Sequence, residues 1–380
     1  MKEKIIRLLK QETVLCAASG LAIVSALLVH PDREYIGYVD FRTLAILFCL
    51  MSVMAGLQKS GVFQSVAQAL LSRVSQVWQL VLILVLLCFF SSMLVTNDVA
   101  LITFVPFTLV VLNMLGPEAK RQLAVPVVVL QTVAANLGSM LTPIGNPQNL
   151  YLYGKAGLSL KAFILLMLPY ASAALLAILV WCLLQSRAYR GAIQISFPER
   201  VELFGGGGRL AVYGVLFGLD LLTVARVIPC GVSLGVTVAA LLLVDRDIFL
   251  RVDYSLLLTF VGFFVFIGNI GRLPVFSQML QRVVSGNEIL AGVAASQIIS
   301  NVPAALLLSG FTENLPALVI GVNLGGLGTL IASMASLISY KLIVREDGGM
   351  KGAYFRYFTA ANVSFLIILL AFALFLGAKA

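Results

Sequence analysis

Long apolar segments follow one another along almost the whole chain and leave little of it for a soluble domain. Hydrophobic residues make up 60% of the 380 positions and charged residues only 11%, whereas soluble domains average about 45–50% and about 25%. A helix needs about 20 apolar residues to cross the hydrocarbon core of a bilayer. We therefore predict an all-α polytopic membrane protein embedded in the lipid bilayer. Uninterrupted spans are expected at residues 11–29, 41–58, 161–185, 209–226, 228–244, 254–271 and 358–378.

Four other apolar segments are interrupted by short polar residues, glycine or proline. Segments 77–114 and 287–311 contain the tetrapeptides VTND and SNVP, and each is predicted to be a re-entrant helical hairpin. Segments 122–152 and 315–340 are predicted to be broken transmembrane helices, because polar residues lie inside each. Irregular backbone is tolerated at membrane depth only where protein or a water-filled cavity satisfies its polar groups.

The two broken segments share an opening motif. Residues 136–153 read NLGSMLTPIGNPQNLYLY and residues 323–340 read NLGGLGTLIASMASLISY, with identical residues at seven of eighteen positions. Other matches keep the same order in both halves. They pair Asp40 with Asp253, Lys59 with Arg272, Ser92 with Ser296, and Asn97 with Asn301. Repeated interruptions of apolar spans are the best sequence indication of a transporter's binding site.

We accordingly divide the chain into repeat 1 (1–186), a linker with an unpaired helix (187–227) and repeat 2 (228–380). Each repeat has four crossings, and the unpaired helix inverts the second repeat relative to the first. With a cytoplasmic N-terminus, 18 of the 26 basic residues lie on the cytoplasmic side, as the positive-inside rule requires. The prediction is a protein of the cell inner (cytoplasmic) membrane with a cytoplasmic N-terminus and a periplasmic C-terminus.

Charge and motif content exclude several classes of protein. The net charge of +9 does not indicate nucleic-acid binding, because the basic residues lie in short loops next to lipid head groups. The sequence has no catalytic dyad, Walker motif or metal cluster, so we expect neither an enzyme nor an ATP-driven pump, and no cofactor apart from a coupling ion such as Na⁺. Lys59 and Arg272 stand at matching ends of spans, where long basic side chains reach toward the membrane interface.

The interrupted segments supply the candidate site. Half-helix N-termini carry about half a positive charge and suit an anion, whereas freed carbonyl groups suit a cation. We predict that the two hairpin tips and the two helix breaks form one site near the bilayer midplane. Its candidate residues are Thr96, Asn97, Asp98, Thr142, Pro143, Gly145, Asn146, Asn149, Ser300, Asn301, Thr329 and Ser333. Gln148 and Ser336 are further polar residues of the breaks.

Asp98 is the one acidic residue among these candidates. An aspartate at the bilayer centre costs about 2.5–3.5 kcal/mol on insertion scales, so a partner or a task is expected for it. Asp98 can bind a cation or carry a proton, and it can also cap the second hairpin helix. We predict a Na⁺ site at Asn97, Asp98 and Asn301. Because no Lys or Arg lies inside the four motifs, helix dipoles and a bound cation would have to balance an anionic solute.

The motifs VTND, ANLGSMLTPIGNPQN, SNVPAA and NLGGLGTLI resemble those of the ion-transporter superfamily. That superfamily holds arsenite permeases, NhaD-type sodium/proton antiporters, citrate transporters and divalent-anion/sodium symporters. The chain is most similar to its YbiR-type inner-membrane branch with a citrate-transporter-like domain, over residues 11–378. The resemblance implies a homodimer in which a transport part moves against a scaffold by elevator-like alternating access. It also implies that Asn97 and Asn301 bind sodium and the substrate carboxylate, as the Ser-Asn-Thr tips of the symporters do.

Taken together, these features predict a secondary active transporter. It would move a small anion, a carboxylate or an oxyanion, across the cytoplasmic membrane with Na⁺ or H⁺. Two alternatives remain open within transport, namely sodium/proton exchange centred on Asp98 and an arsenite-type permease. A membrane enzyme or a receptor is less expected, because the polar residues cluster at repeat-related interruptions and not around an acid–base pair.

Overall fold

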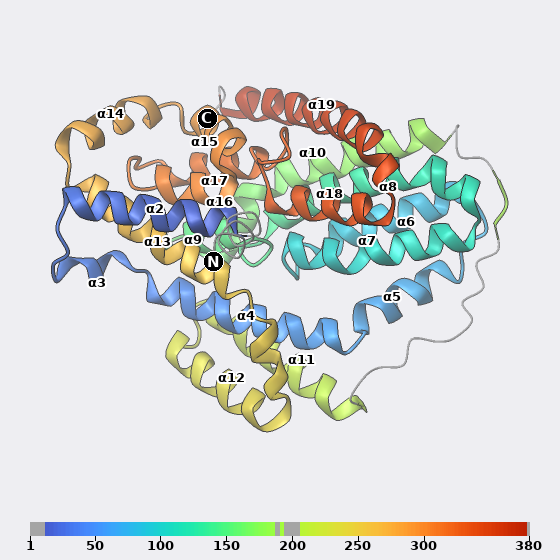
Figure 1. Ribbon diagram of the computed structural model, residues 1–380, viewed down its shortest axis with the longest axis horizontal. Helices are drawn as coiled ribbons and strands as arrows, with labels where there is room; N and C mark the ends of the chain where they lie inside the picture. The colour runs from blue at the N-terminus through green and yellow to red at the C-terminus, as the bar shows by residue number, and fades with distance from the viewer. Residues whose placement is uncertain (1–11, 187–190, 194–205, 378–380) are drawn as a thin grey trace, which may run out of the picture.

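The computed structural model describes residues 12–186, 191–193 and 206–377, and these residues form helices and no strand (Figure 1). Seven of the described helices are long and apolar enough to cross a membrane. The predicted all-α polytopic fold is therefore confirmed. The first half contains α2 (Thr13–Leu28), α3 (Glu34–Tyr38), α4 (Phe41–Lys59), α5 (Val62–Leu71), α6 (Val77–Ser91), α7 (Asn97–Met114), α8 (Pro117–Gly138), η1 (Ser139–Leu141), α9 (Pro147–Lys155) and α10 (Leu160–Ser186).

The second half repeats this order after one additional helix, α11. It contains α11 (Gly206–Val224), α12 (Cys230–Val244), η2 (Arg246–Arg251), α13 (Tyr254–Gly271), α14 (Pro274–Val284), α15 (Glu288–Ile299), α16 (Asn301–Leu308), α17 (Leu315–Leu324), α18 (Met334–Glu346), η3 (Gly348–Met350) and α19 (Lys351–Gly377). The pairs α6–α7 and α15–α16 occupy the two hairpin segments, and α8–α9 and α17–α18 occupy the two broken segments. Helices α5 and α14, which the sequence analysis did not predict, are short amphipathic connectors at matching places in the halves.

The helices pack in two groups (Figure 1). In the first, α2 lies along α13, and α4 packs against α11 and α12; we call it the α4/α13 group. In the second, α8 packs against α6, α7, α10, α18 and α19, and α15 packs against α17; we call it the α8/α17 group. The span that includes α8 is 94% buried, because other helices surround it on all sides. Contacts between the groups include those of α4 with α9 and of α13 with α16.

Ion pairs at matching positions tie the halves of the α4/α13 group together. The Lys59 ammonium lies 2.8 Å from Asp245, and the Arg272 guanidinium lies 2.6 Å from Asp32. Positions 59 and 272, like 32 and 245, are separated by 213 residues, so each half supplies the cation of one pair and the anion of the other. This corrects the expectation for Lys59 and Arg272, which do not simply extend to the membrane interface but bind carboxylates of the opposite half.

These two ion pairs differ in their shielding from water. The side chains of Lys59 and Asp245 are only 15% and 6% exposed, whereas those of Arg272 and Asp32 are 37% and 39% exposed. Burial alone would raise the pKa of Asp245, but hydrogen bonds from Lys59 and Tyr213 lower it below its usual value. The stabilisation from Asp245 is therefore full near neutral pH, and it is lost as the pH falls from the ordinary pKa of a carboxylate through the lowered pKa of Asp245 in the folded protein.

Glycine allows the ends of α8 and α17 to touch the first helix of each hairpin. A Cβ at Gly138 would lie 2.0 Å from the Phe89 carbonyl oxygen and 2.6 Å from Ser92 Oγ. A Cβ at Gly325 would lie 2.6 Å from Ser296 Oγ. Because Gly138 matches Gly325 and Ser92 matches Ser296, both halves dock hairpin and broken helix in the same way. Two helix backbones can come this close only where the residue at the contact is small.

We predict that Gly138→Ala destabilises the protein by about 1–3 kcal/mol, the usual effect of overpacking, because its methyl group would clash with backbone. Gly218→Ala in α11 is the matched control, since a Cβ there meets nothing within 4 Å. Alanine is the better helix former, so that control should be neutral or gain up to about 1 kcal/mol. Thermal unfolding in detergent compares the two variants, and equal unfolding temperatures would contradict the close docking.

Candidate functional site

The first hairpin turns between α6 and α7, where residues 92–96 separate the two helices. The Thr96 hydroxyl accepts a hydrogen bond from the Val99 amide at 3.4 Å and thereby caps α7. The Asn97 amide donates to the carbonyl oxygen of Gly145 at 3.1 Å. The tip of the first hairpin is therefore held by the break in its own half of the chain.

The second hairpin turns at Ser300, directly between α15 and α16. Ser300 has a φ of 75°, in the left-handed region that is uncommon for a residue with a side chain. The Asn301 amide donates to the carbonyl oxygen of Ala332 at 2.9 Å. Positions 145 and 332 correspond in the two broken segments, so the second tip is held in the same way as the first.

The break between α8 and α9 is shaped by Gly145 and Asn146. A Cβ on Gly145 would lie 2.0 Å from the Ser139 carbonyl oxygen, so glycine is required there. The Asn146 side chain accepts from the Asn149 amide at 3.1 Å and caps α9. The Asn149 side chain donates to the carbonyl oxygens of Ser139, Met140 and Thr142 at 3.2–3.4 Å. These side chains replace the helical partners that the backbone loses at the break.

Asn136 links the first hairpin to the second break. Its Oδ1 accepts from Asn97 Nδ2 at 3.0 Å and from Ser333 Oγ at 2.9 Å. Its Nδ2 lies 3.4 Å from Ser336 Oγ. All four residues are buried, so each of these polar groups depends on a protein partner.

Asn323, the counterpart of Asn136, makes the reciprocal contacts to the first break. Its Oδ1 accepts from Asn146 Nδ2 at 3.2 Å, and its Nδ2 donates to Asn149 Oδ1 at 2.6 Å. Positions 146 and 149 correspond to positions 333 and 336 at the offset of 187. The asparagine of each half therefore binds equivalent positions in the other half, as a two-fold relation between the broken segments requires.

A small cavity lies where four helix N-termini meet. Its lining includes the first residues of α7, α9, α16 and α18, with Asp98, Gln148 and Ser333. Its volume is about 10 Å³, close to the minimum that one water-sized particle needs. Four N-terminal dipole ends give this position a positive potential that favours an anion.

Gln148 lines this cavity; the sequence analysis named it as a polar residue of the break but not among the candidate site residues. Its side chain is 1% exposed, and neither its Oε1 nor its Nε2 has a hydrogen-bond partner within the part of the chain that the structure describes. A buried amide without partners costs about 1–3 kcal/mol for each unmet group. Its place directly after Pro147, at the start of a half-helix, is the sequence signal that could have identified it.

Asp98 lies between this small cavity and a larger one of about 160 Å³, which we call the inner cavity. Thr96, Asp98, Asn146, Gln58 and Asp253 are among the residues that line the inner cavity. Asp98 Oδ1 is buried and accepts no hydrogen bond from any described residue. Thr96, and not Asp98, accepts the capping bond of α7. The geometry therefore leaves the Asp98 carboxylate available to a cation or a proton.

Three of the predicted residues lie away from the centre of this arrangement. The Thr142 hydroxyl donates to the Met93 carbonyl oxygen at 2.5 Å and joins the break to the first hairpin. Thr329 is exposed, and its hydroxyl donates to the carbonyl oxygen of Gln297. Pro143 is buried in the loop before α9. These residues shape the two loops, and none of them lines the small cavity or the inner cavity.

Comparison with known proteins agrees with this architecture. The citrate transporter family model matches residues 9–315. The chain belongs to the citrate transporter family. It is 32% identical over 312 residues to the inner membrane protein YbiR of Escherichia coli, covering 80% of each chain. It is 31% identical over 361 residues to the uncharacterized transporter MJ0456 of Methanocaldococcus jannaschii, covering 93% of this chain and 95% of the relative.

A more distant relative shows how far the similarity extends. The 46 kDa membrane protein of Mycobacterium leprae is 26% identical over 406 residues, covering 94% of this chain and 92% of the relative. The match therefore includes both hairpin segments and both broken segments. The family and these relatives identify the protein as a membrane transporter.

We predict that Asn136→Ala destabilises the protein by about 2 kcal/mol or more, because it leaves buried groups of Asn97 and Ser333 without a partner. Asn362→Ala is the matched control. Asn362 is also fully buried, but among the described residues its side-chain amide bonds only to the Phe358 carbonyl oxygen within α19, so a loss of about 1 kcal/mol is expected. Thermal unfolding in detergent measures both. If Asn136→Ala lost no more stability than the control, the hydrogen bonds of Asn136 between the two repeats would not contribute as proposed.

Proposed function

We propose that this protein is a secondary active transporter of a small anion, a carboxylate or an oxyanion, and that Na⁺ or H⁺ drives the transport. The observation that carries the proposal is the meeting of four helix N-termini around Gln148 and Asp98. The dipole ends favour an anion there, and the Asp98 carboxylate favours a cation beside it. A cation and an anion that each bind better in the presence of the other provide coupling.

The size of the small cavity bears on the transport cycle. A volume of about 10 Å³ has no room for a carboxylate, so the tips and breaks must separate to admit one. We propose that the α8/α17 group moves against the α4/α13 group, in an elevator-like alternating access within a homodimer, as the family resemblance implies. The inner cavity then connects this site to the cytoplasm, with the N-terminus cytoplasmic and the C-terminus periplasmic in the inner membrane.

Sodium/proton exchange is the second candidate. It is favoured by the buried Asp98 oxygen, which has no partner among the described residues and lies beside a cavity that would suit a single ion. In that case no organic anion would be needed, and the helix N-termini would serve to keep Asp98 ionised. An arsenite-type permease is a further alternative within the same fold.

Reconstituted protein tests the proposal directly. Liposomes with an imposed Na⁺ or pH gradient should accumulate labelled citrate or succinate, and accumulation should stop when the gradient is collapsed. Proton movement against Na⁺ with no added anion would favour the exchanger. Accumulation of neither carboxylate, together with uptake of arsenite, would favour the permease.

Asp98→Asn should abolish the dependence of uptake on the ion gradient and reduce accumulation at least tenfold, because the amide binds neither H⁺ nor Na⁺ as a carboxylate does. Asp247→Asn is the matched control, since the Asp247 side chain is 78% exposed and far from the motifs in sequence. Uptake by the control should stay within about twofold of the native protein. Unchanged ion dependence in Asp98→Asn would remove Asp98 from the coupling mechanism.

A further inference from the structure

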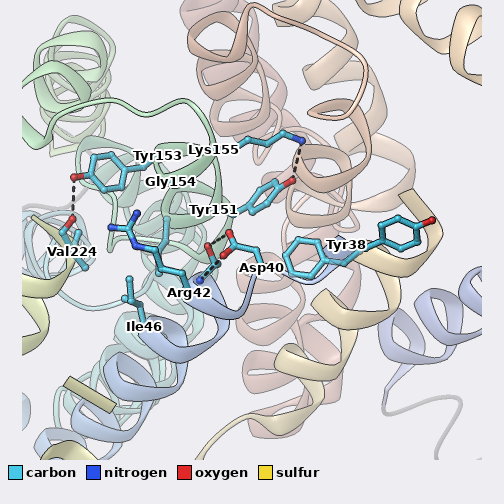
Figure 2. Close-up of a pocket in the computed structure, with 12 residues that line it drawn as sticks. Tyr38, Asp40, Arg42, Ile46, Tyr151, Tyr153, Gly154, Lys155 and Val224 are labelled. Carbon is cyan, nitrogen blue, oxygen red and sulfur yellow. Dashed lines mark hydrogen bonds between the residues drawn. The ribbon is translucent and has the colours of Figure 1, made fainter. Parts of the chain in front are cut away.

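A second, larger pocket shares Leu150 with the inner cavity, and Figure 2 shows residues that line it. It has a volume of about 280 Å³ and is lined by the start of α4, the end of α9, and α13. We call it the α4–α9 pocket. Leu150 is 3% exposed and lines both this pocket and the inner cavity, so one side chain stands between the two spaces.

Two cations, Arg42 and Lys155, line the α4–α9 pocket, and neither forms an ion pair with a described residue. Within the described residues, the half-buried Arg42 makes no hydrogen bond or ion pair. The Lys155 ammonium lies 3.3 Å from the Tyr151 hydroxyl (Figure 2). It also lies 3.2 Å from Ser309 Oγ, and both partners are neutral groups. A charge held away from bulk water is stabilised by an opposite charge.

Among the described residues, Asp40 is the one acidic residue that lines this pocket, so two cations stand against one carboxylate there, and that carboxylate also caps a helix. Oδ1 accepts from the Thr43 amide at 3.0 Å and Oδ2 accepts from the Thr43 hydroxyl at 2.5 Å, which caps α4 (Figure 2). Asp253 caps α13 in the same way through the Leu256 amide at 3.0 Å. The acid therefore has a structural role that both halves share.

The two cations, in contrast, have no counterpart in the second half. The position that matches Arg42 at the offset of 213 is Ser255, and the position that matches Lys155 at the offset of 187 is Leu342. The repeated architecture therefore forms without them. This asymmetry is typical of residues that act on a ligand and not of residues that hold the fold.

We propose that the α4–α9 pocket is a second anion subsite, in which Arg42 and Lys155 bind a carboxylate of the solute before it passes Leu150. The proposal rests on the anion transport proposed above. The planar guanidinium of Arg42 can hold a carboxylate through two parallel hydrogen bonds. The pocket has the volume of roughly nine water molecules, which suits a small di- or tricarboxylate, and the Ile46 side chain and the Tyr151 ring offer apolar surface to its carbon skeleton.

Neutralisation of the two cations tests this subsite. In liposomes, Arg42→Gln and Lys155→Gln should each raise the KM for citrate and succinate about tenfold and leave kcat within about twofold. Arg42→Lys keeps the charge but loses the fork geometry, so its KM should lie in between. Arg33→Gln is the matched control, because Arg33 is an exposed arginine directly before α3 that does not line the pocket. The proposal would be overturned if Arg33→Gln and Arg42→Gln changed the KM equally, or if neither Arg42→Gln nor Lys155→Gln changed it.

Binding to purified protein separates this inference from the transport proposal. Calorimetric titration of Asp98→Asn protein with citrate, succinate and sulfate should still detect carboxylate binding, and adding Arg42→Gln should weaken that binding about tenfold. If the native protein takes up the carboxylates and the KM is the same in Arg42→Gln and Lys155→Gln, the subsite alone is contradicted. Absence of both anion uptake and anion binding would contradict both proposals, and binding of sulfate without either carboxylate would contradict the ligand class.

Discussion

The fold depends on hydrogen bonds to the backbone amide and carbonyl groups that are left unpaired where helices break or turn inside the membrane. An unpaired amide or carbonyl group in hydrocarbon costs several kcal/mol, and this chain breaks or turns its helices four times. Each hairpin tip donates an amide to the break of its own half, at Gly145 and at Ala332. Asn136 and Asn323 then cross to the opposite half and bind equivalent positions there. The exchange makes the two halves mutually dependent and places four helix N-termini around one point.

The two sides of this point differ in charge although the backbone arrangement is repeated. The inner cavity contains the unpaired carboxylate oxygen of Asp98, whereas the α4–α9 pocket contains two cations, Arg42 and Lys155, and one carboxylate, Asp40. Under the proposals above, a symmetric scaffold with asymmetric charges would give a solute and a coupling ion different binding positions. Leu150 lies between them.

Local patterns predicted the helical fold well, and they predicted the site only in part. Runs of apolar residues locate the spans, and Gly, Pro and Asn inside such runs mark where helices end. The role of Thr329 could not be predicted, because the direction of a side chain in an irregular loop is set by packing and not by the local sequence. The pairing of Lys59 with Asp245 and the approach of Arg42 to Lys155 join residues more than one hundred positions apart. Such contacts depend on the tertiary arrangement.

An experimental map of the protein in a lipid nanodisc with citrate and Na⁺ tests the central claim most directly. The account predicts anion density against the first turns of α7 and α16, in contact with Gln148, and a separate ion at Asp98. It also predicts that both Asn-Leu-Gly segments end their helices there. Continuous helices through residues 136–153 and 323–340, or bound anion only at a distance from both hairpin tips, would contradict the account.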